Sequence, residues 1–136
     1  MILADTSAWV EYDRATGSDV DRRMVELIRD EGPLAVTEPV VMEVVAGART
    51  GERELELRRL LLRFELLGFD GTVDFDGAAR IYRRCRRAGV TPRGLVDCMI
   101  GAVALRHAAS LLAADSDLLR VAGVMGIDLD RPSLER

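Results

Sequence analysis

The stretch Met1-Ile2-Leu3-Ala4-Asp5-Thr6-Ser7 carries the pattern on which the fold prediction rests. Its apolar part, from Met1 to Ala4, predicts a short strand, and Asp5-Thr6-Ser7 is typical of a turn or a helix cap directly after it. Similar apolar runs return at Leu34-Ala35-Val36 and from Ser110 to Ala114. Short strands that alternate with helical segments favour an α/β fold with a parallel sheet.

Helical periodicity fills the segments between these strands. Pro39 falls in the first turn of the second predicted helix, where proline is tolerated. The chain has 136 residues and no repeat or long linker, so it predicts a single domain over 1–136. Residues 127–129 are expected to add an edge strand, and the predicted helices span 19–29, 37 to about 49, 52–67, 76–88, 95–107 and 116–124.

The predicted helix over 52–67 carries more leucine than one buried helix face needs. Either part of this surface meets a partner chain, or the whole helix is buried inside the monomer. The main stripe is Leu57, Leu60, Leu61, Phe64 and Leu67, and it is widened by Leu55, Leu62, Leu66 and Phe69.

The composition excludes several classes of protein. Hydrophobic residues make up 49% of the chain, yet no apolar run approaches the roughly 20 residues that cross a bilayer. The first residues lack a basic segment, so we expect no signal peptide, no membrane partner and a cytoplasmic location. Cys85 and Cys98 lie in apolar helical patterns without CxxC spacing, which predicts core residues and argues against a zinc site.

The formal charge of -4 does not indicate a nucleic-acid binder, but all 19 basic residues are arginine. Codon composition explains this choice, and the planar guanidinium also suits phosphate. The predicted helix over 76–88 points a row of arginines outward, and another arginine comes shortly before Asp97. A solvated helix face is the alternative for each of them. The phosphate-binding candidates are Arg80, Arg83, Arg84, Arg87 and Arg93.

Four acids stand at positions that converge in a parallel sheet. Asp5 and Asp115 each follow a predicted strand. Glu43 lies about two turns into the helix after the second strand, and Asp97 lies in the first turn of the helix that follows Gly94. Ligands of parallel α/β sheets gather outside the carboxyl ends of the strands. We therefore expect these four carboxylates to face one crevice.

Such a cluster predicts a metal ion. Two carboxylates about 5 Å apart repel by roughly 3 kcal/mol at an effective dielectric constant near 20, so a cation or protons must offset the charge. Oxygen ligands without nearby cysteine or histidine favour Mg²⁺, with Mn²⁺ as the alternative. A bound ion of this kind activates water and neutralises phosphate charge, which suits phosphodiester hydrolysis.

Each acid also has a structural alternative. Asp5 is a common helix-capping residue before Thr-Ser, and Asp115 and Asp117 suit the dipole of the last predicted helix. Glu43 has the alternative of a solvated helix position. Glu43 and Asp97 nevertheless interrupt strongly apolar helical segments, which favours a functional role for both.

Four segments resemble the motifs of PIN domains in order and over nearly the whole chain, and the chain length resembles the VapC-type toxins of bacterial toxin–antitoxin pairs. The segments are Leu3-Ala4-Asp5-Thr6-Ser7-Ala8, Val41-Met42-Glu43-Val44-Val45-Ala46-Gly47-Ala48-Arg49, Leu95-Val96-Asp97-Cys98-Met99-Ile100-Gly101-Ala102 and Leu112-Ala113-Ala114-Asp115-Ser116-Asp117-Leu118. The fourth departs from the usual pattern, with Ala114 in place of a threonine and Leu118 in place of a phenylalanine.

The resemblance implies a PIN-like three-layer sandwich, with a parallel sheet of four to five strands flanked by helices. It implies a Mg²⁺-dependent endoribonuclease in which metal-activated water cleaves RNA and leaves a 5′-phosphate. It also implies a cognate antitoxin partner and a homodimer. Asp5, Glu43, Asp97 and Asp115 would be the catalytic and metal-binding residues, Asp117 a further metal ligand, and Thr6 and Ser7 supporting residues.

Two rival functions use the same acids. A phospho-acceptor receiver domain also places acids at strand ends, but it needs a lysine and this chain has none. A catalytically silent PIN-like module that binds RNA or a protein partner is the stronger alternative. Loss of Mg²⁺-dependent RNA cleavage on substitution of the acids distinguishes an enzyme from such a module.

Overall fold

The computed structural model describes residues 1–134 and places β1 (Ile2–Ala4) inside a four-stranded parallel sheet. The strand order is β3-β2-β1-β4, with β2 (Leu34–Val36) and β4 (Ser110–Leu112) on either side of β1 and β3 (Glu65–Leu66) at one edge. Leu3 pairs with Ala35 on one side and with Leu111 on the other. The predicted parallel α/β sheet is confirmed.

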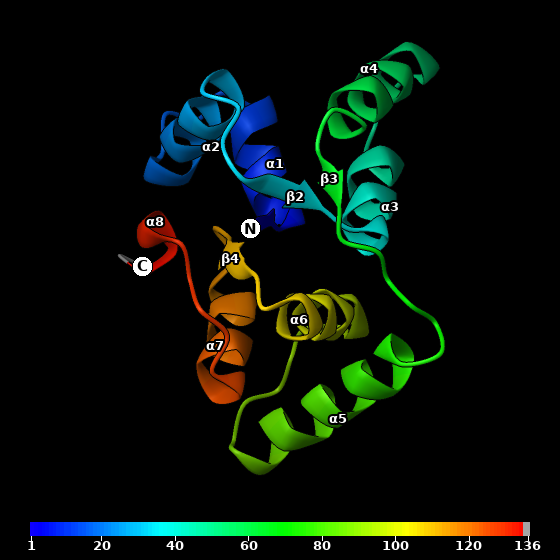
Figure 1. Cartoon of the computed structure of the whole chain (residues 1–136), viewed down its shortest axis with the longest axis vertical. Coiled ribbons are helices and arrows are strands. Elements are labelled where there is room, and N and C mark those ends of the chain that lie inside the picture. The colour runs from blue at the N-terminus through cyan, green and yellow to red at the C-terminus, as the bar shows by residue number, and fades with distance from the viewer. Residues whose placement is uncertain (135–136) are drawn as a thin grey trace.

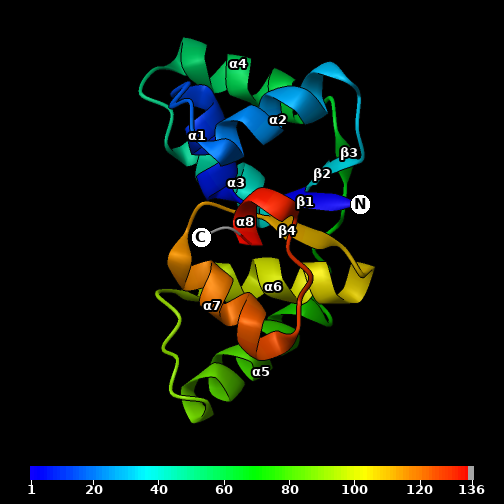
Figure 2. The ribbon, with the colours of Figure 1, turned by 90° about the vertical axis from the view of Figure 1, so that its left-hand side faces the viewer.

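Helices cover both faces of this sheet, which gives the three layers that the sequence analysis expects. Figures 1 and 2 agree that α1 to α4 lie on one side and α5 to α7 on the other. The short α8 lies beside β4 near the C-terminus (Figure 2). The helices are α1 (Thr6–Asp13), α2 (Asp19–Arg29), α3 (Glu38–Ala46), α4 (Gly51–Leu61), α5 (Asp74–Arg87), α6 (Leu95–His107), α7 (Ser116–Met125) and α8 (Arg131–Leu134).

Capping side chains explain where several helices begin. Ser18 accepts a hydrogen bond from the backbone N–H of Asp21 at the start of α2, and Thr50 accepts one from Arg53 at the start of α4. These contacts satisfy donors that the first helical turn leaves free. Asp5 and Asp115 cap α1 and α7 in the same way, so two of the predicted site acids also start helices.

The prediction of one helix over 52–67 is wrong at its C-terminal end. Helix α4 ends at Leu61, and Glu65–Leu66 form the edge strand β3, which pairs in parallel with Ala35 and Val36. Helical spacing of leucines continues through this segment, so periodicity could not reveal the break. Pairing with the unsatisfied edge of β2 supplies backbone hydrogen bonds that outweigh the local helical pattern.

Smaller differences concern the ends of elements. Residues 6–13 form a full helix, α1, where the sequence analysis left a turn or a cap open. Helix α3 ends at Ala46 rather than near residue 49, because the chain turns at Gly47 toward α4. The expected edge strand over 127–129 is reduced to a single bridge between Leu111 and Leu129. The short helix α8 was not expected from the sequence.

The apolar side chains of the leucine-rich segment differ widely in exposure. Leu57, Leu61 and Leu67 are buried in the chain, whereas Leu55, Leu62 and Leu66 are exposed. The alternative in which the whole helix is buried inside the monomer is therefore wrong, and contact between the exposed leucines and a partner chain stays a prediction. Cys85 and Cys98 are buried free thiols, as expected. Across residues 1–134, no helix has the length and apolar character that crossing a bilayer requires.

Adjacent leucines at the end of α4 test this division. We expect Leu61→Ala to lower the free energy of unfolding by about 2–5 kcal/mol, because Leu61 is only 2% exposed and its truncation leaves a cavity. Leu62 is 83% exposed, and Leu62→Ala should change stability by no more than about 0.5 kcal/mol. Urea unfolding followed by circular dichroism measures both variants. Equal losses would contradict the packing described here.

Candidate active site

The four predicted acids come together in one pocket. A hollow of about 370 Å³ is lined by Asp5, Glu43, Asp97 and Asp115, together with Thr6, Ser7, Val10, Glu11, Arg93 and Ala114. It lies at the carboxyl ends of β1 and β4, where the strand order reverses direction. This switch point is the usual ligand position in an open parallel sheet.

Asp5 reaches the pocket because it is both the residue after β1 and the N-cap of α1. Its Oδ2 accepts a hydrogen bond from the Ser7 backbone N–H at 3.1 Å and another from the Ser7 hydroxyl at 2.7 Å. The same hydroxyl accepts from the Ala114 N–H at 2.9 Å, so Ser7 connects the end of β1 to the segment after β4. Asp5 Oδ1 is buried and has no hydrogen-bond partner.

Asp97 enters the pocket from the first turn of α6. The residue is 7% exposed, and its Oδ2 is also buried without a hydrogen-bond partner. An unpaired carboxylate oxygen in this position costs free energy unless a proton or a cation lies against it. Asp5 and Asp97 therefore line the same pocket, and each has one buried carboxylate oxygen without a hydrogen-bond partner.

Glu43 is held in place by Thr6. The Thr6 hydroxyl donates a hydrogen bond of 2.6 Å from Oγ1 to Glu43 Oε1. This contact links α1 to α3 across the pocket, and it fixes the direction of a carboxylate that lies two turns into its helix. Thr6 and Ser7, the predicted supporting residues, therefore contact Glu43 and Asp5 respectively.

Asp115 uses its two oxygens differently. Oδ1 accepts from the backbone N–H of Asp117 at 2.9 Å, which caps α7, while Oδ2 forms an ion pair with Arg93. Asp117 does not line the pocket, and its carboxylate pairs with Arg120 on the same helix. Its contact with the site is the backbone N–H that orients Asp115.

Burial and mutual repulsion raise the pKa values of the two innermost acids. Burial is the main cause for Asp97, and the charges of Asp5 and Asp115 add to it, so that the Asp97 pKa rises to about 7 despite the opposing charge of Arg93. Burial also raises the Asp5 pKa, against the hydrogen bonds from Ser7 that lower it. Both shifts make these carboxyl groups easier to protonate than a free aspartic acid side chain.

The donor set fits a hard divalent cation. Two buried carboxylate oxygens lack partners, the remaining candidates are oxygens, and neither histidine nor cysteine lines the pocket. Within residues 1–134, no three of the Asp, Glu, His and Cys side chains stand close enough to form a complete cation site. Arg93 holds Asp115 and Thr6 holds Glu43, so a full set of ligands requires side chains to move.

The predicted arginines differ in their distance from the acids. Arg93 lines the pocket, whereas the other four candidates lie exposed on α5 and outside its lining. Arg80 forms an ion pair with Asp76. Glu11, which the sequence analysis did not identify, also lines the pocket. Its position one turn beyond Ser7 on α1 is the only signal that could have indicated it.

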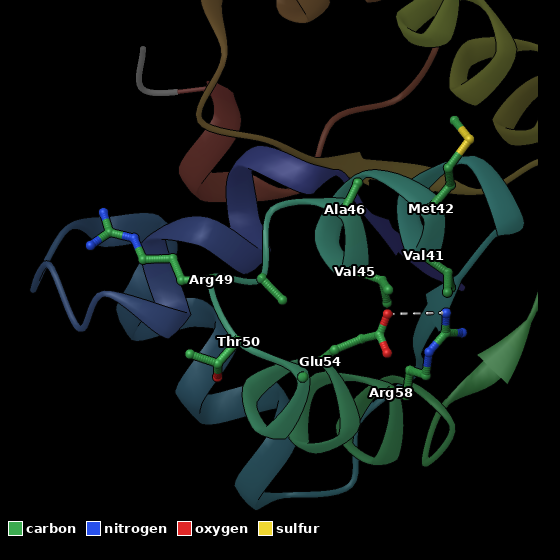
Figure 3. Close-up of a pocket in the computed structure, with 10 residues that line it drawn as sticks. Val41, Met42, Val45, Ala46, Arg49, Thr50, Glu54 and Arg58 are labelled. Carbon is green, nitrogen blue, oxygen red and sulfur yellow. Dashed lines mark ion pairs between the residues drawn. The ribbon is translucent and has the colours of Figure 1, made fainter.

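A larger hollow of about 640 Å³ lies between α3 and α4 (Figure 3). Its wall is partly apolar, with Val41 and Val45 from α3 facing α4. Glu54 is the acid among the residues that line it, and it pairs with Arg58 at 3.8 Å. None of the four predicted acids takes part, so this hollow lacks the donors of a cation site.

The sequence of the chain matches a known family. The family model described as "PIN domain" matches residues 2–124. The chain belongs to the PIN domain family. Ribonuclease VapC11 of Mycobacterium tuberculosis is 42% identical to this PIN domain over 128 residues, which cover 93% of this chain and 96% of the relative. The predicted family resemblance is confirmed.

Solved structures show the same PIN fold at lower identity. VapC20 of Mycobacterium tuberculosis, described as a "Sarcin-Ricin loop cleaving toxin", aligns with a TM-score of 0.68 at 19% identity, covering 97% of this chain and 100% of that one. A "Toxin-antitoxin complex from Klebsiella pneumoniae" gives a TM-score of 0.69 at 19% identity, covering 97% and 98%. The three-layer α/β architecture is therefore that of known structures.

The raised pKa of Asp97 predicts how stability depends on pH. Since Asp97 titrates near 7 in the folded chain and near its ordinary value of 3.8 when unfolded, its ionisation disfavours folding. Without divalent ions, stability should fall from about pH 4 to pH 7 and stay low above that. Asp97→Asn should weaken this slope and stabilise the protein at pH 8 by on the order of a few kcal/mol. Part of the slope should remain, because the Asp5 pKa is also raised.

Urea unfolding between pH 5 and pH 8 in the presence of a chelator provides the measurement. Asp128→Asn is the matched control, because Asp128 is exposed and lies outside the pocket. Identical pH profiles of stability for the wild type and Asp97→Asn would show that ionisation of Asp97 does not cause the pH dependence.

Proposed function

We propose that this PIN domain is a Mg²⁺-dependent endoribonuclease that acts as the toxin of a toxin–antitoxin pair. The observation that carries the proposal is the pair of buried, unpartnered oxygens, Asp5 Oδ1 and Asp97 Oδ2, that belong to acids lining the same pocket. Two such groups without partners are costly in a structural core, but they are what a divalent cation needs.

Asp5, Glu43, Asp97 and Asp115 are the residues proposed to hold Mg²⁺, and Mn²⁺ would fit the same oxygens. Asp117 is assigned to the outer part of the site, since its backbone N–H orients Asp115. When bound, Mg²⁺ would activate water, neutralise phosphate charge and align an in-line displacement.

The chain's own residues would position this reaction. Ser7 orients Asp5 through two hydrogen bonds to Oδ2, and Thr6 orients Glu43 through one hydrogen bond to Oε1. In the proposed reaction an oxygen of water forms a bond to phosphorus while the bond to the 3′-oxygen breaks. The products would carry a 5′-phosphate and a 3′-hydroxyl.

RNA is proposed as the substrate on two grounds. VapC11 is named a ribonuclease, and it shares 42% identity with this chain over nearly the full length of both. Exposed arginines could also hold an anionic polymer beside the pocket, where phosphate contacts set position rather than sequence preference. The candidates are Arg93 at the pocket and Arg80, Arg83, Arg84 and Arg87 on α5.

The proposed partners are a cognate antitoxin and a second copy of this chain. The Klebsiella pneumoniae structure of the same fold is described as a toxin–antitoxin complex, which supports an antitoxin. The exposed Leu55, Leu62 and Leu66 offer apolar surface for one of these protein contacts. We propose that the protein acts in the cytoplasm, where cellular RNA is available.

Substitution of the buried acids tests the proposed enzyme. We expect Asp5→Asn and Asp97→Asn each to lower the rate of Mg²⁺-dependent cleavage by more than the roughly 10–100-fold typical of outer-shell metal residues. The measurement is cleavage of a structured RNA, with sequencing of the 5′-phosphate ends. Asp128→Asn is the matched control and should cleave like the wild type.

Two results would contradict the proposal. Cleavage that survives both substitutions would place the active site elsewhere, and cleavage in the presence of a chelator would remove the metal from the reaction. A wild-type protein that binds RNA tightly but never cleaves it would instead support a catalytically silent module.

The hydrogen bond between Thr6 and Glu43 gives a separate prediction. Thr6→Val keeps the shape of the side chain but removes the hydroxyl that orients Glu43, so we expect cleavage to fall by roughly 10–100-fold with little change in folding. Thr6→Ser retains the donor and should recover most of the activity. Initial rates across a Mg²⁺ titration provide the measurement, and equal rates for Thr6→Val and the wild type would exclude this orienting role.

A further inference from the structure

Arg93 is the one guanidinium among the residues that line the acidic pocket. It lies in the connection between α5 and α6, between the buried Pro92 and Gly94, the residue before α6. Its side chain is 66% exposed, yet its tip forms an ion pair with Asp115, whose side chain is only 11% exposed. A surface arginine thus extends inward to a carboxylate that the site needs.

We propose that Arg93 is an exchangeable counter-ion, which a divalent cation must displace from Asp115 to complete the site. This inference rests on the metal dependence of the proposed function. It explains why the acids line one pocket while no three of them in residues 1–134 form a complete cation site. The oxygen that Arg93 occupies, Asp115 Oδ2, is the one that helix capping leaves free.

The charges in the pocket explain why a counter-ion is needed. Five acids line the hollow, and Arg93 is the single positive side chain among its lining residues. Arginine cannot lose its proton near neutral pH, so its charge is permanent. It acts on more than its direct partner, because the negative charges of Asp115, Asp97 and Asp117 all raise the Arg93 pKa, led by Asp115.

The structure also explains how Arg93 can leave. Asp115 is its sole ion-pair partner within residues 1–134, and most of its side chain is already in solvent. Partly exposed pairs of this kind are weak, so a divalent ion competes well. The Asp117 N–H continues to hold Asp115 Oδ1 after the exchange, which keeps the carboxylate oriented toward the pocket.

Release gives the guanidinium a second partner. Arg93 remains tethered at the rim of the pocket, where the scissile phosphate would lie beside the bound cation. A planar guanidinium can contact two phosphate oxygens at once. Arg93 would then exchange a carboxylate in the metal-free protein for a phosphate in the substrate complex.

Binding of Mn²⁺ to the whole protein without RNA tests the exchange. We expect Arg93→Ala and Arg93→Gln to bind Mn²⁺ about fivefold more tightly than the wild type, because the competing ion pair is gone. Arg59→Ala removes an exposed arginine of α4 that lines neither of the two hollows described above, and it controls for the change in net charge. Electron paramagnetic resonance of free Mn²⁺ measures the affinity, and circular dichroism checks that each variant is folded.

The outcomes separate this inference from the proposed function. A wild type that binds no Mn²⁺ overturns both. A wild type that binds Mn²⁺, with Arg93 variants that bind it no more tightly than Arg59→Ala does, overturns the counter-ion role alone. At saturating Mg²⁺, Arg93→Ala should raise the KM for RNA severalfold, with partial recovery in Arg93→Lys, and an unchanged KM overturns the phosphate contact.

Discussion

The burial of two carboxyl groups that each have an oxygen without a hydrogen-bond partner is the constraint on which the rest of this site depends. Asp5 and Asp97 come from opposite parts of the chain, yet they meet in one pocket with an unpartnered oxygen each. Burial disfavours the charged form of both carboxyl groups, and repulsion from neighbouring acids adds to this effect. The chain retains this cost in its core, as the raised pKa values of both acids show.

The same acids also contribute to the fold. Asp5 Oδ2 and Asp115 Oδ1 cap α1 and α7, and the other oxygen of each carboxylate is left for the pocket. Capping and metal binding, which the sequence analysis treated as alternatives, are therefore compatible in one side chain. A carboxylate fixed through one oxygen loses little further freedom when its second oxygen binds a ligand.

Neutral hydroxyls and one arginine complete the surroundings of the acids. Ser7 and Thr6 are neighbours in sequence, but Ser7 contacts Asp5 at the end of β1 and Thr6 contacts Glu43 on α3. Arg93 supplies the positive charge, and because most of its side chain is in solvent, the guanidinium can move away from Asp115. Hydrogen bonds from Thr6 and Ser7 in the first turn of α1 therefore orient two of the acids, and the ion pair from Arg93 in the loop before α6 reaches a third.

The sequence by itself predicted the parallel α/β class, three of the four strands, the four acids that meet in one pocket and the PIN resemblance, because period and motif spacing are local properties of a chain. It could not place the edge strand Glu65–Leu66, since its leucine spacing continues a helix and only the free edge of β2 favours a strand there. Nor could it show that Arg93 reaches Asp115 while the arginines of α5 stay outside the pocket. Such contacts join residues far apart in the chain, and only the packed structure decides which of them meet.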